Sequence, residues 1–235
     1  LTGPLDRYAS TAPLGPDPDR QDGPHAHQVV PDPGRPGEVL VCDLGTDRVH
    51  RLRLEPDGRL VEAAPALVLP AGFGPRHLVV AGDTLVVAGE LSAQLWLGRR
   101  DDAGWQATQL VPTTRATPDE RARLTAVVAP SALRLVGDQV VAATRGVDTV
   151  SVFALDRAAG TVVLVAETSC GGHHPRDLVG VDGLLWLANQ GSDEIVVLDL
   201  AAITSGDDAV VLRFDFPRPA CLVLLDHGTT AEGGA

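Results

Sequence analysis

A six-residue block recurs four times along the chain, at intervals of about 45 to 55 residues. Each copy follows one short apolar run and precedes another. A block repeated at such a period marks a repeat architecture in which every copy belongs to one structural unit. The apolar runs are rich in Val and Leu and are bounded by Gly, Asp and Pro, which is typical of short strands. The four copies are Cys42–Asp47, Ala88–Ala93, Ala143–Asp148 and Ala188–Asp193.

The strand pattern predicts an all-β fold, a β-propeller of four-stranded antiparallel blades. The strand-like runs form four sets, with three runs in the first set and four in each later set. The run 220–225 resembles the inner strand of a further blade, so we expect four to five blades. We expect a single domain over residues 1–235, with an extended N-terminal segment at 1–23 and a frayed tail at 226–235.

One stretch between the second and third sets does not read as a strand. Thr117 is a suitable N-cap, Pro118 fits the first helical position and Glu120 completes a capping box. The sequence therefore predicts one or two helical turns within the loop 112–124.

Composition narrows the classes of partner. The net charge is −12, and nucleic-acid binding requires a basic face, so we expect no nucleic-acid partner. No apolar run approaches the roughly 18 residues that span a bilayer, and the first residues do not resemble a signal peptide. We therefore expect a cytoplasmic protein with no membrane partner. Cys42, Cys170 and Cys221 are widely spaced and show no metal-ligand pattern, so we expect no cofactor and no metal.

The third position of the block changes character between copies. Equivalent positions of a propeller face the same place, so a Glu and an Arg at this position are expected to meet in one site. The aspartates that end three copies, Asp47, Asp148 and Asp193, are explained by turn formation alone. The variable position is occupied by Leu44, Glu90, Arg145 and Gln190.

A second element, in which Pro stands beside polar residues, precedes the inner strand of three sets. Its copies are Pro24–Gln28, Gly74–His77 and His174–Asp177, while Pro130–Leu133 keeps the place without the charged residues. Both elements are expected at the same mouth of the central channel. For His77 a structural hydrogen bond is an alternative, and a histidine metal site is a further one. The predicted ring consists of His25, His27, Arg76, His77, Glu90, Arg145, Arg176 and Gln190.

The order and spacing of these motifs resemble the lactonase family of seven-bladed β-propellers. That family includes the propeller type of 6-phosphogluconolactonase and carboxy-cis,cis-muconate cyclase. The resemblance covers about residues 15–225, although Gly89 and Thr144 stand where the family has Asn. The motifs that carry it are Pro24–Gln28, Asp43–Val49, Gly74–His77, Glu90–Ser92, Arg145–Asp148 and Ala188–Asp193.

The resemblance implies hydrolysis of an anionic sugar lactone, most simply a 6-phosphogluconolactone. Glu90 would be the general base, Arg76 and Arg145 would hold anionic groups, and His27 would carry a proton. The remaining ring residues, His25, His77, Arg176 and Gln190, would bind substrate. A non-catalytic binding or scaffold propeller and a lactone-forming cyclase stay open as alternatives.

The family resemblance also implies a larger ring than this chain supplies. Seven blades need on the order of 300 residues or more. The chain resembles the later part of that ring, so we expect a missing segment or a partner chain to complete it. An open, decayed or re-closed propeller is the third alternative.

Overall fold

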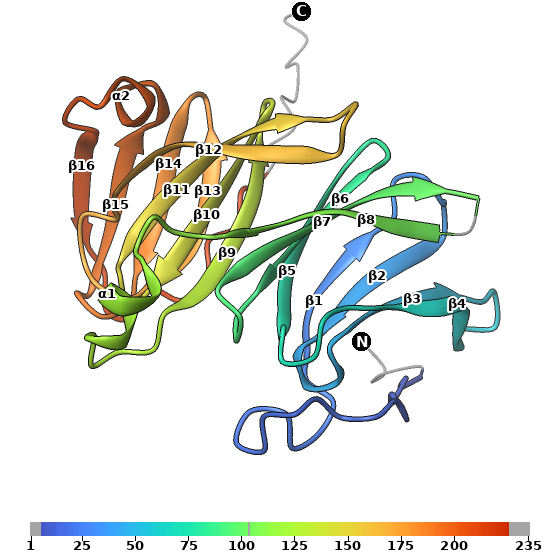
Figure 1. Cartoon of the computed structure of the whole chain (residues 1–235). Coiled ribbons are helices and arrows are strands. Elements are labelled where there is room, and N and C mark those ends of the chain that lie inside the picture. Colours follow the sequence, from blue (N-terminus) through green and yellow to red (C-terminus); the bar gives the residue numbers. More distant parts are fainter. Residues whose placement is uncertain (1–5, 103, 226–235) are drawn as a thin grey trace, which may run out of the picture.

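The structure is a computed structural model that describes residues 6–102 and 104–225, and its strands form four sheets of four antiparallel strands. The sheets stand side by side in an arc (Figure 1), with strand order following the chain in each. Blade A contains β1 (Ala26–Pro31), β2 (Glu38–Asp43), β3 (Arg48–Leu54) and β4 (Leu60–Val68). Blade B contains β5 (Pro75–Ala81), β6 (Thr84–Gly89), β7 (Gln94–Asp101) and β8 (Gly104–Pro112). Blade C contains β9 (Ala129–Val136), β10 (Gln139–Arg145), β11 (Thr149–Asp156) and β12 (Thr161–Ser169). Blade D contains β13 (Pro175–Val181), β14 (Leu184–Asn189), β15 (Glu194–Asp199) and β16 (Val210–Asp215).

This arrangement confirms the predicted blades of a propeller and sets their number at four in the described residues. Residues 220–225 form no strand, which corrects the expectation of an inner strand there. A strand needs a neighbouring strand for its backbone groups. Here the amide of Leu222 instead donates to the carboxylate of Asp177 at 3.0 Å.

Three elements were not predicted from the sequence, namely the 3-10 helix η1 (Leu44–Thr46), strand β4 and helix α2 (Leu200–Ser205). Strand β4 completes blade A although Pro65 lies inside it, because β4 is the outermost strand of its sheet and an edge strand tolerates proline. Helix α2 follows β15 and is capped by Asp199, whose carboxylate accepts hydrogen bonds from two amides of the first turn. The predicted helix is confirmed as α1 (Pro118–Ala122), with both bonds of the capping box formed. The tail predicted at 226–235 lies outside the described residues, and residues 6–25 contain no helix or strand.

The hydrophobic core lies between the blades. One apolar cluster joins blades A and B, a second joins B and C, and a third joins C and D. Strand β6 is buried at all six positions, as the nearly continuous apolar sequence predicted for strands covered on both faces. Successive blades also pack through their first strands, β1 against β5, β5 against β9 and β9 against β13. The first strands therefore form the inner edge of the arc.

The repeated block forms the turn between the second and third strands of each blade. The last residue of every copy has a left-handed backbone, with φ of 52° at Asp47 and 54° at Ala93, Asp148 and Asp193. Aspartate tolerates this conformation better than most residues. The Asp47 carboxylate also accepts hydrogen bonds from the amides of Gly72 and Gly74 at 2.7 Å. The block thereby ties blade A to the loop that begins blade B.

Candidate active site

The first strand of every blade contains one residue that has no partner in the second strand. The pairing of β1 with β2 skips His27, and the pairing of β5 with β6 skips Arg76. The same irregularity occurs at Ser131 in β9 and at Arg176 in β13. A bulge re-aims the side chain of its extra residue. Four equivalent bulges on the inner edge of the arc therefore present one residue from each blade.

Glu90 is the centre of an ion-pair cluster at this inner edge. Its side chain is only 3% exposed, and its Oε2 atom lies 2.5 Å from Nη1 of Arg76 and 3.2 Å from Nη2 of Arg145. His27 Nε2 accepts a hydrogen bond from Arg76 Nη1 at 3.1 Å and lies 3.9 Å from Glu90 Oε2. The four residues that the sequence predicted to be catalytic therefore lie together, brought there from blades A, B and C.

Both arginines are fixed by the backbone of β9. Arg76 Nε donates to the carbonyl oxygen of Ser131 at 2.7 Å, and Arg145 Nε donates to that of Ala129 at 3.3 Å. Arg145 Nη2 is buried and faces Glu90 Oε2 at 3.2 Å, so this nitrogen is held by the carboxylate. A guanidinium group has five N–H donors, so Arg145 can pair with Glu90 and still donate to an oxygen atom of a ligand.

A third arginine on Glu90 was not found by sequence reasoning. Arg20, in the N-terminal segment, donates from Nη2 to Glu90 Oε1 at 2.6 Å. The segment contains no repeated element that would have placed Arg20 in the ring. One carboxylate thus faces three guanidinium groups, and the cluster keeps an excess of positive charge on a chain whose net charge is −12. Such a local excess attracts small anions.

The electrostatics of the cluster set the protonation states near neutral pH. Burial alone would raise the pKa of Glu90, but the hydrogen bond from Arg20 and the charges of Arg76 and Arg145 lower this pKa from 4.5 to about 2. Burial, followed by the charge of Arg76, lowers the pKa of His27 from 6.5 to about 4. Glu90 is therefore ionised and His27 neutral at pH 7.

The other four predicted residues lie around the cluster in different ways. His25 Nε2 is paired with Asp22 at 2.7 Å and lines a cavity of about 200 Å³ together with Arg20 and His27. Arg176 has no hydrogen bond or ion pair within the described part of the chain. Burial lowers the pKa of Arg145, and the charge of Arg176 lowers it further. Gln190 donates its backbone amide to the carbonyl of His174 at 3.2 Å. Substrate binding by these residues stays a prediction.

His77 lies in the contact between blades B and C. Its Nδ1 atom accepts from Arg134 Nη1 at 3.2 Å and from the amide of Leu133 at 3.4 Å. This is the structural hydrogen bond that the sequence analysis left open as an alternative. Burial, and then the charge of Arg134, lowers the pKa of His77 to about 3. A substrate-binding role for His77 stays a prediction.

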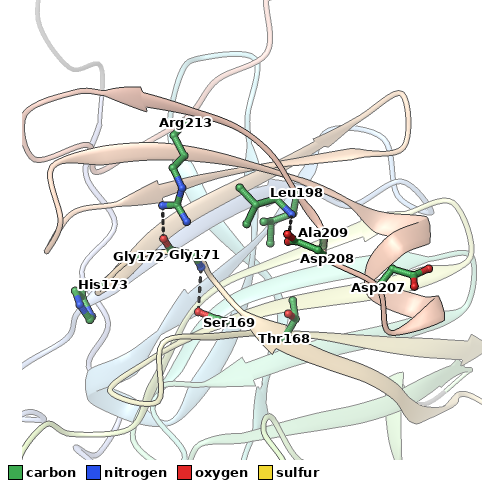
Figure 2. Close-up of a pocket in the computed structure, with 11 residues that line it drawn as sticks. Thr168, Ser169, Gly171, Gly172, His173, Leu198, Asp207, Asp208, Ala209 and Arg213 are labelled. Carbon is green, nitrogen blue, oxygen red and sulfur yellow. Dashed lines mark hydrogen bonds between the residues drawn. The ribbon is translucent and has the colours of Figure 1, made fainter.

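A larger cavity, of about 430 Å³, lies apart from these residues between blades C and D (Figure 2). Arg213 lines it and donates to the carbonyl of Gly171 and to Glu194 at 2.8 Å, so its charge is already paired. None of the eight predicted ring residues lines this cavity.

Among residues 6–102 and 104–225, no group of three His, Cys, Asp or Glu side chains is arranged to hold a metal ion. The helices found there are too short to span a membrane.

The histidine pKa values predict how stability depends on pH. An unfolded histidine titrates near 6.5, whereas folded His77 titrates near 3 and folded His27 near 4. The unfolded chain therefore binds more protons below pH 6.5, and the free energy of unfolding falls as the pH falls. Each histidine contributes up to about 1.4 kcal/mol per pH unit in its window.

We expect His77→Asn to flatten this dependence between pH 6.5 and pH 4. Asn places a neutral acceptor near the position of Nδ1 and does not titrate. Urea denaturation of both proteins at a series of pH values measures the slopes. If the free energy of unfolding has the same slope against pH in the variant and in wild type, the pKa of folded His77 is not lowered.

The fold and this cluster define a class of protein: a β-propeller in which arginines from two blades and from the N-terminal segment surround one buried carboxylate. The chain belongs to the Lactonase, 7-bladed beta-propeller family, whose model matches residues 3–224.

Known proteins that resemble the chain agree with this membership. It is 27% identical over 231 residues to a 6-phosphogluconolactonase of Bacillus subtilis, covering 96% of this chain and 64% of that protein. A solved protein of Lactobacillus plantarum is 31% identical with a TM-score of 0.76, covering 88% of this chain and 60% of that one. The periplasmic gluconolactonase of Pseudomonas aeruginosa is 26% identical with a TM-score of 0.74, covering 86% and 57%. The chain thus spans less than two thirds of the length of these relatives.

Proposed function

We propose that the site around Glu90 hydrolyses a sugar lactone that carries an anionic group, with 6-phosphogluconolactone as the first candidate. The observation that supports this most is the contact of one ionised carboxylate with Arg76 and Arg145, beside the neutral imidazole of His27. Family membership and the names of two relatives, a 6-phosphogluconolactonase and a gluconolactonase, point to the same chemistry. A role in carbohydrate metabolism in the cytoplasm belongs to this proposal.

Lactone hydrolysis requires a base for water and a donor for the developing oxyanion. Glu90 takes one proton from water as the water oxygen bonds to the lactone carbonyl carbon. The guanidinium of Arg145, which lies beside Glu90, stabilises the negative charge that grows on the carbonyl oxygen. When the tetrahedral intermediate collapses, the bond from the carbonyl carbon to the ring oxygen breaks. The proton that Glu90 took from water passes through His27 to that oxygen, which leaves as the alcohol of the open-chain acid, and Glu90 is ionised again.

The anionic substituent of the substrate needs a second positive group. Arg176 is the bulge residue of β13 and has no ion-pair partner in the described residues, so it is free to bind a phosphate or carboxylate. His25 and Gln190 would contact the sugar hydroxyls.

The competing interpretation is an arginine-rich site that binds anions without turnover. The low pKa of Glu90 favours this interpretation, because a weakly basic carboxylate removes protons poorly.

Hydrolysis is measured directly by titrating the acid released from 6-phosphogluconolactone at constant pH. We expect a rate well above the spontaneous rate, and saturation with substrate. Arg213→Ala is a suitable control, since Arg213 lies in blade D and pairs with Glu194 away from the cluster. The lactonase proposal fails if the purified chain leaves the spontaneous rate unchanged for both phosphorylated and unphosphorylated gluconolactone.

A further inference from the structure

Arg20 differs from the other two arginines in how it reaches Glu90. Its side chain is 45% exposed, whereas those of Arg76 and Arg145 are 7% and 10% exposed. Arg20 alone contacts Oε1, because the other two arginines both approach Oε2. The guanidinium of Arg20 therefore stands between the carboxylate and solvent.

The backbone that carries Arg20 is a rigid turn. The carbonyl of Asp17 accepts from the amides of Arg20 and Gln21, and the Asp17 carboxylate accepts from the amide of Arg20 as well. Gln21 is 2% exposed, and its side-chain amide donates to the carbonyl of Leu44 at 2.9 Å. The turn is thereby fixed to the first copy of the block in blade A, and the position of Arg20 is set by the fold.

The side chain of Arg20, by contrast, is fixed at one point only. Arg76 and Arg145 each donate a further hydrogen bond to the backbone of β9, and both are buried. Within the described residues, the side chain of Arg20 makes no hydrogen bond or ion pair other than the one with Glu90. An ion pair that is half exposed is screened by water and contributes little to stability. Arg20 is therefore the one arginine of the three that can leave Glu90 without disturbing the blades.

A place for a ligand adjoins this contact. The cavity of about 200 Å³ is lined by Arg20, His25 and His27 together with Asp19, Asp22 and Leu44. Arg20 thus borders both the cavity and the carboxylate. A ligand anion in the cavity would compete with Glu90 for the same guanidinium.

We propose that Arg20 is a displaceable cap on Glu90. When an anionic lactone enters the cavity, the Arg20 guanidinium leaves Oε1, joins Arg176 in pairing with the charged group of the substrate and uncovers the carboxylate for reaction. Arg20 is thereby a specificity-determining residue that couples recognition of the anionic group to activation of Glu90. The identity of the substrate rests on the function proposed above, but the displacement by an anion does not.

The charges around Glu90 give this displacement a measurable consequence. Glu90 faces Arg20 from the N-terminal segment, Arg76 from β5, Arg145 from β10 and His27 from β1. If an anion draws Arg20 away, one cation fewer stabilises the carboxylate, and the pKa of Glu90 rises. A stronger base is then present only while the anionic ligand is bound.

The test compares wild type with Arg20→Met, using Arg213→Met as the matched control. Arg213 is 47% exposed and is likewise ion-paired, but at the outer side of blade D. We expect Arg20→Met to lower kcat/KM for 6-phosphogluconolactone by about 10- to 100-fold, the range for a lost charged hydrogen bond. Hydrolysis of unphosphorylated gluconolactone should remain within about threefold of wild type or rise. Arg213→Met should change neither value.

Two measurements on the folded protein do not require turnover. Calorimetry with inorganic phosphate should show about tenfold weaker binding to Arg20→Met. Carboxyl-carbon NMR titration should show that phosphate raises the Glu90 pKa in wild type, whereas in Arg20→Met this pKa is already raised and phosphate leaves it unchanged.

The outcomes separate the two proposals. Equal losses of kcat/KM for both lactones in Arg20→Met would overturn the displacement. So would a Glu90 pKa in wild type that is the same with and without phosphate. If wild type hydrolyses neither lactone, the proposed function fails, and the calorimetry and NMR experiments still decide the role of Arg20.

Discussion

Replacing Glu90 by Gln lowers the free energy of unfolding by about 3–5 kcal/mol, the range for removing one partner from a buried ion pair. Glu90 is 3% exposed and is the carboxylate shared by Arg76 and Arg145, both nearly buried. Without it, two buried guanidinium groups face each other with no counter-charge. The contribution of Arg20 is smaller because water screens its half-exposed side chain. Urea denaturation at pH 7 measures this loss.

A second variant distinguishes lost charge balance from lost packing. Adding Arg76→Met to Glu90→Gln removes one of the unpaired cations, so the double variant should be more stable than the sum of the single losses implies.

Because folded Glu90 has a pKa of about 2, its stabilising effect is fully present above pH 4.5 and is lost as the pH falls toward 2. A loss below about 1 kcal/mol at pH 7 would show that the ion pairs contribute little.

We expect the replacement of Arg145 by Ala to lower kcat/KM for the proposed hydrolysis of 6-phosphogluconolactone by about 10²- to 10³-fold, the range for a lost oxyanion donor. The guanidinium of Arg145 is nearly buried and is held in place by the carbonyl of Ala129 and by Glu90. Arg145→Lys should recover only part of the activity, because an ammonium lacks the planar fork of donors. Steady-state kinetics at constant pH measure both variants.

The control for Arg145 is Arg134, which lies on the neighbouring strand β9 and is ion-paired with Asp177 at 2.6 Å. Arg134→Ala removes a partly buried arginine of the same blade without touching Glu90. Equal reductions of kcat/KM in Arg134→Ala and Arg145→Ala would assign the effect to a general disturbance of blade C. An unchanged kcat/KM in Arg145→Ala would show that Arg145 takes no part in the reaction.

The four-copy block allowed much of this site to be predicted. Equivalent positions of a repeat converge, so Glu90 and Arg145 could be placed together without any knowledge of distances. The Pro-containing element likewise placed His27 and Arg76 at the inner edge, and the structure adds the reason: each occupies a β-bulge. The pattern did not show that His77 would be held by Arg134 and Leu133, since that contact joins two blades.

Arg20 and strand β4 show where sequence patterns fail. Arg20 reaches Glu90 through a turn whose position depends on the buried contact of Gln21 with Leu44, and no periodicity records such a contact. Strand β4 was missed because Pro65 interrupts its pattern, although an edge strand accepts it. In both cases tertiary contacts determine the outcome.

The most direct test of the proposed lactonase site is the rate at which Glu90→Gln hydrolyses 6-phosphogluconolactone, with the spontaneous rate subtracted. The assay is run at a temperature where circular dichroism shows the variant to be folded. We expect kcat to fall by about 100-fold or more relative to wild type, as for a lost general base. A folded Glu90→Gln variant that hydrolyses the lactone as fast as wild type would contradict a catalytic role for this carboxylate.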